Sequence, residues 1–361
     1  MDDRDNRASD SAVPGMLAGP RGRRLCLALA GRLSPDVSQA QFWLAYELDP
    51  GRGTSRGVMY FADGASANEP ERAVMSVPEF AELIRESGIP PLRASDVNEA
   101  LRDSVDSARY WQEPDGEDVL AAQPEVRAAL EPIARAVQAN VASEDWGATA
   151  ATTQWRIAWE NARPRGLPTS DLLKEWADAT RADEVRSRTD RPTDPRARYS
   201  GEWWSTPGAV PNTSGVIPRG LDLVEDSSGW EAATVRPLEV DGRRTLEIRT
   251  AENWAGLCRA HPLDVTASRR HDWFRATGRD GSWVMPDWQA VSAEWDAVHL
   301  SVAAYLALAG RLIDVDGEER ASVIAGWSPD TTWWLTEPPT SDAPPQNWHR
   351  ADPQAPWSRR P

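Results

Sequence analysis

Apolar residues recur with helical spacing through most of the first half of the chain. Ser76 and Glu79 have the spacing of a capping box and precede an apolar run, which is typical of the start of a helix. Pro124 and Pro132 lie inside another helical pattern and are expected to break or kink it. The remaining helical patterns cover residues 16–33, 95–111, 117–142 and 169–184. We therefore expect a mainly helical N-terminal domain.

A β-hairpin is predicted inside that domain, over residues 41–62. Alternate positions from Phe42 to Leu48 are apolar, which is the period of a half-buried strand. A stretch rich in glycine and proline follows, and a second apolar run completes the pattern. These features are typical of two strands joined by a turn.

The second half of the chain mixes helical and strand periods. Residues 186–198 contain no large apolar side chain, so we predict a linker there, with a long surface loop as the alternative. Helical spacing recurs at 252–260 and 302–312. Strand-like runs lie at 199–205, 221–225, 233–240, 245–248, 282–285, 297–302 and 322–325.

These patterns together predict an α+β fold. A chain of 361 residues is long enough for two hydrophobic cores. The predicted parts are a disordered tail (1–14), a mainly α domain with the hairpin (15–185), the linker (186–198), a tryptophan-rich α+β domain (199–335) and a proline-rich tail (336–361) expected to be disordered or polyproline-like.

The charge balance of the chain is acidic. Asp and Glu number 56 against 40 Lys and Arg, and the formal net charge is -16. Such a charge repels a phosphate backbone, and the densest arginine cluster (Arg21, Arg23 and Arg24) is too small to reverse this. We therefore expect no nucleic-acid partner. Lys174 is the only lysine, so lysine Schiff-base chemistry has a single candidate residue.

Cysteine usage and hydropathy suggest where the protein resides. Cys26 and Cys258 are the only cysteines, and the chain has no Cys-x-x-Cys pair, so the usual zinc and iron–sulfur spacings are excluded. We expect no metal site and leave the cofactor open. No apolar run approaches the length of a membrane span, and the longest candidate for a secretory signal is too short. We therefore expect a cytoplasmic protein with no membrane partner.

Tryptophan is concentrated in the second half of the chain. Of 19 tryptophans, 13 lie at or after Trp203. An aromatic core is one interpretation, and a platform on which a planar ligand stacks is the other. Adjacent strand residues point to opposite faces, so only one residue of the pair Trp203-Trp204 can share a core face. The candidate ligand-binding residues are Trp203, Trp204, Ser205, Thr206, Trp283 and Trp288.

Histidines and carboxylates gather in the segment 261–302. Three of the four histidines lie there. The candidate catalytic residues are His271, Asp272, Asp296 and His299, because histidine beside a carboxylate can supply a general acid and a general base, or can form a His/Asp metal site. The alternative is that these side chains form local pairs and cap turns.

The pattern Asp296-x-x-His299 resembles the Asp-x-x-His block of SGNH (GDSL-type) hydrolases. The resemblance implies that His299 is a base oriented by Asp296. In that family a serine near the start of the fold is the nucleophile, whereas this chain has no Gly-Asp-Ser block after a strand. The match covers about a dozen residues.

A second resemblance involves the run Trp203-Trp204-Ser205-Thr206. It is similar to the aromatic-Ser-Thr strand end that lines the nicotinamide pocket of ADP-ribosyltransferases. The resemblance implies a later catalytic glutamate, for which Glu239 and Glu247 are candidates, but the chain has no clear Glu-x-Glu motif.

The sequence leaves two classes of function open. The first is a small-molecule-binding enzyme, for group transfer or hydrolysis, with its pocket in the C-terminal domain. The second is a non-catalytic protein that binds a protein partner through exposed tryptophans and the proline-rich tail.

Overall fold

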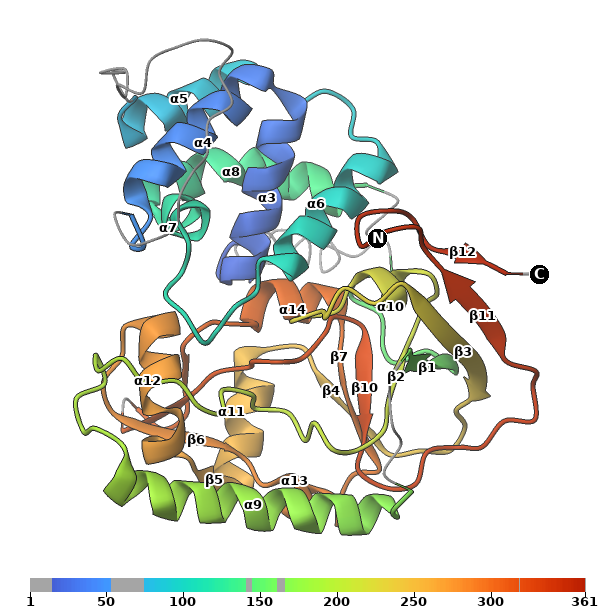
Figure 1. Cartoon of the computed structure of the whole chain (residues 1–361). Coiled ribbons are helices and arrows are strands. Elements are labelled where there is room, and N and C mark those ends of the chain that lie inside the picture. Colours follow the sequence, from blue (N-terminus) through green and yellow to red (C-terminus); the bar gives the residue numbers. More distant parts are fainter. Residues whose placement is uncertain (1–14, 53–74, 141–144, 161–165, 318, 361) are drawn as a thin grey trace, which may run out of the picture.

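The computed structural model describes residues 15–52, 75–140, 145–160, 166–317 and 319–360, and within these ranges it is an α+β structure (Figure 1). Helices α3 to α8 form one part of the molecule, which we call the helical part. The strands and the remaining helices form the other, which we call the sheet part. The helices of the helical part are α3 (Pro20–Leu33), α4 (Pro35–Leu48), α5 (Val77–Ser87), α6 (Ala94–Asp106), α7 (Gly116–Ala122) and α8 (Pro124–Gln138).

The predicted capping box is present at the start of α5. The Ser76 side chain accepts a hydrogen bond from the backbone N–H of Glu79, and the Glu79 carboxylate accepts one from the backbone N–H of Ser76. Pro124 begins α8, whereas Pro132 lies inside that helix without ending it. Helices α3, α5 and α6 therefore lie where the helical patterns predicted them, apart from their bounds, and the pattern over 117–142 is divided between α7 and α8.

The predicted strand over residues 41–48 is wrong, because these residues belong to α4. Ser34 caps that helix by accepting from the N–H of Val37, and Pro35 occupies its first turn. The buried face is formed by Val37, Gln41, Leu44 and Ala45, which recur at helical spacing. The alternation that favoured a strand includes Phe42, whose side chain is 49% exposed. The second strand of the predicted hairpin lies outside the described residues.

The sheet part contains two sheets. The larger has the strand order β12-β11-β3-β1-β2-β10-β7-β4, in which β4 and β7 are parallel and the other neighbours are antiparallel. The smaller has the order β5-β6-β9-β8. The strands are β1 (Thr153–Trp159), β2 (Asn212–Ser214), β3 (Ala232–Glu239), β4 (Thr245–Ile248), β5 (Pro262–Asp264), β6 (Ser282–Pro286), β7 (Ala297–Leu300), β8 (Ile313–Asp314), β9 (Arg320–Ser322), β10 (Thr331–Trp334), β11 (Gln346–His349) and β12 (Ser358–Arg359).

The helices of the sheet part cover these strands, and the longest of them corrects one prediction. The helices are α9 (Thr169–Asp190), α10 (Arg219–Asp222), α11 (Ala251–Ala260), α12 (Thr266–Thr277), α13 (Trp288–Val291) and α14 (Val302–Leu308). Helix α9 packs against α12 and continues to Asp190, so the first residues of the predicted linker are helical. Glu184 anchors this packing, since its carboxylate accepts from the backbone N–H groups of Ala267 and Ser268.

Three other predictions for the second half are also corrected. The C-terminal residues are not a disordered tail, because β11 pairs with β3 and β12 pairs with β11. Trp357 is buried against β3 in a small second core. Residues 219–222 form α10 rather than a strand, and residues 199–205 are not a strand of either sheet.

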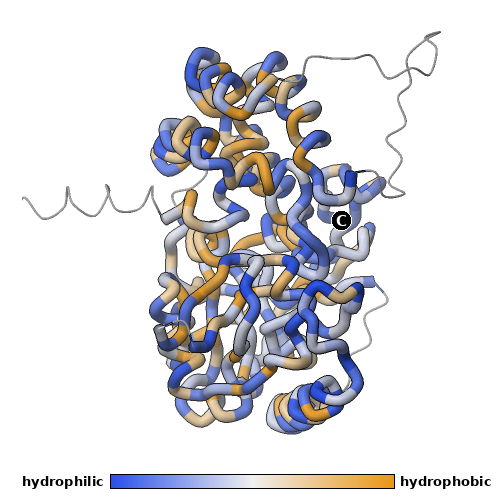
Figure 2. Tube along the Cα trace, turned by 90° about the vertical axis from the view of Figure 1, so that its left-hand side faces the viewer, coloured by the Kyte–Doolittle hydropathy of each residue, from blue (hydrophilic) through white to orange (hydrophobic). Residues whose placement is uncertain are grey.

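One hydrophobic core extends through both parts of the molecule. Its buried members include Leu25 and Leu29 of α3 as well as Ile248 and Leu300 of the larger sheet. Figure 2 shows hydrophobic segments in both parts and at the junction between them. None of the described helices has the length and hydrophobicity needed to cross a membrane.

Helices α3 and α14 pack against each other across the junction. Gly19, just before α3, lies so near α14 that a Cβ atom there would come within 2.3 Å of the carbonyl oxygen of Leu306. A glycine is therefore required at this position. The contact places the first residues of α3 directly against the sheet part.

Candidate functional site

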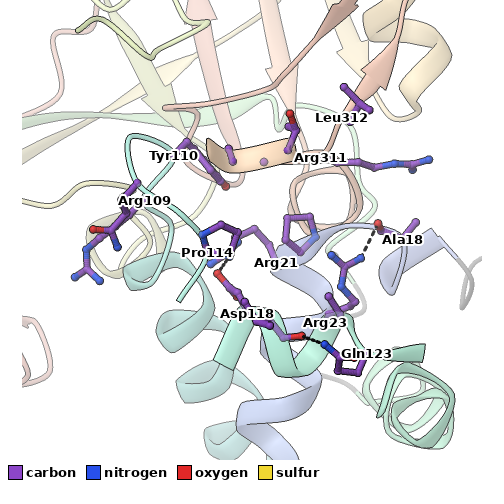
Figure 3. Close-up of a pocket in the computed structure, with 17 residues that line it drawn as sticks. Ala18, Arg21, Arg23, Arg109, Tyr110, Pro114, Asp118, Gln123, Arg311 and Leu312 are labelled. Atoms are coloured by element: carbon purple, nitrogen blue, oxygen red, sulfur yellow. Dashed lines mark hydrogen bonds and ion pairs between the residues drawn. The ribbon is translucent and has the colours of Figure 1, made fainter. Parts of the chain in front are cut away.

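A cavity of about 370 Å³ lies at the junction between the two parts (Figure 3). This volume is in the usual range for small-molecule sites. Its walls come from the start of α3, the loop between α6 and α7, the end of α12 and the segment after α14. The described lining residues are Ala18, Pro20, Arg21, Arg23, Arg109, Tyr110, Gln112, Pro114, Asp118, Val119, Ala122, Gln123, Ala276, Thr277, Gly310, Arg311 and Leu312. We call this space the junction cavity.

Arg21 is held rigidly in the wall of the junction cavity. Its side chain is 2% exposed, and Nη1 donates to the carbonyl of Ser104 (2.8 Å) and to the hydroxyl of Ser107 (2.7 Å). Its other terminal nitrogen forms an ion pair with Asp118. Burial opposes the charge, but Asp118 together with Tyr110 and Tyr305 outweighs burial and raises the pKa of Arg21. The Nε atom of Arg21 is buried without a hydrogen-bond partner in the described part of the chain.

Arg23 also lines the junction cavity, but no carboxylate among the described residues forms an ion pair with it. Nη1 donates to the carbonyls of Leu17 (3.2 Å) and Ala18 (2.9 Å), and the Nε atom is buried without a described partner. Burial and the positive charges of Arg127, Arg21 and Arg311 lower the pKa of Arg23 to about 10, against the opposing effect of Asp118. The guanidinium stays charged at neutral pH, in a region of positive potential.

Two further arginines extend this positive potential along the junction cavity. Arg109 lies at one end of the cavity and Arg311 at the other, with Arg21 between them (Figure 3). Neither Arg109 nor Arg311 pairs with a carboxylate in the described ranges. Among the described lining residues the one carboxylate is that of Asp118, which is already paired with Arg21. The lining is therefore strongly cationic although the whole chain is acidic.

Tyr110 forms the wall of the junction cavity that faces the sheet part. Its ring lies against Gly310, where a Cβ atom would come within 2.2 Å of the ring. The Tyr110 hydroxyl donates a hydrogen bond of 3.0 Å to Oε1 of Glu225, and Oε2 of Glu225 accepts from the backbone N–H of Gly326 (2.8 Å). Burial raises the pKa of Glu225 to about 7, although these hydrogen bonds oppose the shift. A titratable carboxyl therefore lies directly behind the wall.

Two other hollows border the same junction, but their charges are largely neutralised within the protein. The wider one contains the ion pairs of Arg24 with Asp115 and of Arg32 with Asp103. The smaller one, of about 220 Å³, contains the pair of Arg102 with Asp222. Because the described lining of each of these hollows contains several carboxylates, they have less unbalanced positive charge than the junction cavity.

The structure places His299 in a cluster away from the three cavities. His299 on β7 is buried, with Nδ1 at 2.8 Å from Glu247 Oε2 and Nε2 at 3.3 Å from Asp330 Oδ1. Burial opposes the charge on the imidazole, but the hydrogen bonds to Asp330 and Glu247 outweigh it and raise the pKa of His299. Asp330 has a left-handed backbone (φ 55°), and Gly215 lies against its carboxylate. Both nitrogens are therefore occupied by carboxylates.

The other candidate catalytic residues have structural partners. Asp296 accepts from the backbone N–H of Arg244 (2.9 Å) and pairs with its guanidinium, so the implied pairing of Asp296 with His299 is wrong. His271 Nδ1 lies 3.3 Å from the carbonyl of Pro195, and burial lowers its pKa. Asp272 accepts from the Ser200 hydroxyl and the Gly201 N–H. His271 and Asp272 therefore hold residues 195–201 against α12.

Most of the candidate ligand-binding residues are packed inside the protein. Trp283 and Trp288 are 0% exposed, and Trp203 and Thr206 are also buried. Ser205 is buried and forms backbone and side-chain hydrogen bonds with Ala325. Trp204 is 38% exposed, but its ring lies against Gly326 and is not part of the described lining of any of the three cavities. The described geometry thus favours the aromatic-core interpretation for these residues.

The sequence patterns did not identify the junction cavity. The local cluster Arg21, Arg23 and Arg24 was visible in the sequence, but as a nucleic-acid patch it is too small. Across the described ranges, no group of three or more His, Cys, Asp and Glu side chains is arranged to hold a metal ion. The chain matches no protein-family profile, no curated protein sequence and no solved structure.

Proposed function

We propose that this protein binds a small organic anion in the junction cavity. The observation that carries the proposal is the charge of the lining, in which four arginines face one carboxylate in a chain of net charge -16. Arg21 forms an ion pair with that carboxylate, which belongs to Asp118. Arg23, Arg109 and Arg311 are left without a described acidic partner. An anion would supply the missing charge, and arginine forms strong charge-assisted hydrogen bonds with carboxylates, sulfonates and phosphates.

The lining also indicates that the ligand has an apolar body. Ala18, Pro114, Val119 and Leu312 contribute apolar surface between the arginines. The guanidinium groups of Arg23, Arg109 and Arg311 provide hydrogen-bond donors next to that surface. An aromatic or aliphatic acid matches this combination better than an inorganic ion, since burial of its body adds to the binding free energy.

The proposed ligand site lies at the junction of the two parts, whereas the sequence patterns predicted it in the C-terminal domain. Catalysis is not part of the proposal, although Glu225 behind Tyr110 is a titratable group close to the cavity. A docking surface for a protein partner has less support, because Trp204 is the sole exposed residue among the candidate tryptophans. We also propose a cytoplasmic location, in keeping with the two buried, unpaired cysteines.

A thermal-shift comparison of matched ligands tests the proposal. Benzenesulfonate and benzoate should raise the melting temperature, whereas their neutral amides, benzenesulfonamide and benzamide, should not. A ligand present at about 100 times its dissociation constant stabilises a protein by about 2.7 kcal/mol. Arg23→Gln should clearly reduce the shift, and Arg156→Gln, which changes an exposed arginine on β1, should retain it. Equal shifts with the acids and the amides would contradict the proposal.

A further inference from the structure

Glu225 carries a buried carboxyl that is separated from the junction cavity by one side chain, that of Tyr110. Tyr110 is both a lining residue of the cavity and a hydrogen-bond donor to Glu225. Glu225 itself lies in the sheet part, in the segment between α10 and β3. Its backbone N–H donates to the Ser328 hydroxyl (3.2 Å), so the residue is anchored through both its backbone and its carboxyl. A charge placed in the cavity therefore acts on this carboxyl across a single ring.

No cation among the described residues forms an ion pair with the Glu225 carboxyl. The charged and titratable groups that face it are Tyr110 from the loop after α6, Tyr305 from α14 and Arg21 from α3. Arg21 is already paired with Asp118 of α7. Within the described ranges no ion pair involves Glu225. A buried carboxylate without an ion pair is unstable relative to its protonated form, which agrees with the raised pKa of about 7.

The surroundings of Glu225 can also accept a hydrogen bond from its protonated carboxyl. The hydroxyl of Tyr305 is buried beside the carboxyl and makes no well-aligned hydrogen bond to a described residue. A protonated carboxyl has one O–H to donate, and the Tyr305 oxygen can accept it. Tyr110 and Gly326 can keep donating to the carboxyl oxygens in that state. The site thus has hydrogen bonds available for both protonation states.

We propose that the junction cavity takes up its anion together with one proton, which is held by Glu225. This inference rests on the proposed function. An anion in the cavity destabilises a nearby carboxylate by like-charge repulsion but leaves the neutral carboxyl almost unaffected. Binding therefore shifts Glu225 toward its protonated form. The proton comes from solvent and adds to a carboxyl oxygen, and no other bond changes.

Proton uptake can be measured directly with benzenesulfonate, which does not titrate near neutral pH. The ligand is added to the full-length protein in unbuffered potassium chloride at pH 7, and the pH change is recorded. Because Glu225 is about half protonated at a pH equal to its pKa, the expected uptake is about half a proton per ligand bound. Calorimetry in imidazole and Tris chloride should show affinity falling several-fold between pH 7 and pH 8.

Two substitutions test whether Glu225 is the group that takes up the proton. Glu225→Gln should bind benzenesulfonate with no proton uptake and with affinity independent of pH between 6 and 8. Asp226→Asn changes a neighbouring carboxyl that lines the smaller hollow rather than the junction cavity, and it should leave the uptake unchanged. Asn is suitable there because Asp226 has a left-handed backbone (φ 54°), which Asn tolerates.

Tyr110→Phe keeps the inference testable if Glu225→Gln does not fold. Loss of the phenol donor should raise the pKa of Glu225 and move the uptake to higher pH. Undiminished uptake in Glu225→Gln, an unmoved profile in Tyr110→Phe, or binding without uptake in the wild type would overturn the inference while leaving anion binding intact. Absence of benzenesulfonate binding in the wild type would instead overturn the proposed function.

Discussion

The hydroxyl of Tyr110 donates a 3.0 Å hydrogen bond to Oε1 of Glu225, and this bond joins the two parts of the molecule beside the junction cavity. Tyr110 belongs to the loop between α6 and α7, and Glu225 belongs to the sheet part. Both groups are buried, so the bond is shielded from solvent. The protonation state of Glu225 therefore affects both the stability of the junction and the charge next to the cavity.

Glu225 should make stability depend on pH. Its pKa is about 7 in the folded protein against an ordinary value of 4.5, so the folded state is destabilised as pH rises from about 4.5 through about 7. The full effect is on the order of 3 kcal/mol. Glu225→Gln lacks this loss, so its free energy of unfolding relative to wild type should increase between pH 5 and pH 8. Chemical denaturation measures this difference, with Glu86→Gln on the surface of α5 as the control. Parallel pH profiles for Glu225→Gln and wild type would contradict the assignment.

His299 should titrate above the ordinary histidine value. A neutral imidazole has one N–H, whereas His299 faces carboxylates at both nitrogens, so the protonated ring fits the site best. The stabilisation is fully present below about pH 6.5 and is lost as pH rises through the higher folded pKa. Histidine NMR titration, assigned with His299→Gln, measures this pKa. Glu247→Gln and Asp330→Asn should each lower it. A wild-type pKa below the ordinary value would show that burial dominates.

Gly310 is expected to be required for the position of the Tyr110 ring. A Cβ atom at Gly310 would lie 2.2 Å from that ring, and the backbone there has φ of 71°. Gly317 has nearly the same φ (72°), and nothing lies within 4 Å of the position that a Cβ atom would take there, so Gly317→Ala measures the backbone cost alone. Gly310→Ala should be more destabilising than Gly317→Ala by about 1–3 kcal/mol, because the ring must move. Equal losses in chemical denaturation would contradict the close packing of Tyr110.

The tryptophans should differ sharply in their contribution to stability. Trp288 is 0% exposed and its indole N–H donates to the carbonyl of Ser205 (2.9 Å), so Trp288→Ala should cost about 3–5 kcal/mol. Trp204 is 38% exposed, and Trp204→Ala should cost clearly less. Denaturant titration of both variants checks this difference. A similar loss in the two would argue against the core interpretation of Trp288.

The sequence predicted local elements better than long-range contacts. The capping box of Ser76 and Glu79 identified α5 because both residues belong to one helical turn. The strand predicted near Phe42 failed because alternation over a few residues also occurs on a helix, and the Ser34-Pro35 start signal was the stronger evidence. Local periodicity alone could not show which face of this segment is buried.

The site depended on contacts that spacing cannot show. The sequence predicted His299 as a candidate catalytic residue, but its partner Glu247 lies on the neighbouring parallel strand and Asp330 lies in the segment before β10. The junction cavity brings Arg23 and Arg311 together from distant positions in the sequence. The arginine cluster was visible in the sequence. That Arg21 forms an ion pair with Asp118, whereas Arg23 forms none with a described carboxylate, can be seen only in the structure.

The affinity of benzenesulfonate for the wild type, Arg23→Gln and Arg156→Gln tests the central claim most directly. Calorimetry in Tris chloride at low and high potassium chloride should give binding to the wild type that weakens as salt rises. Arg23→Gln should weaken it about tenfold or more, since a charge-assisted hydrogen bond is lost, while Arg156→Gln should match the wild type. Equal affinities for Arg23→Gln and wild type, or no measurable binding to either, would contradict an anion site in the junction cavity.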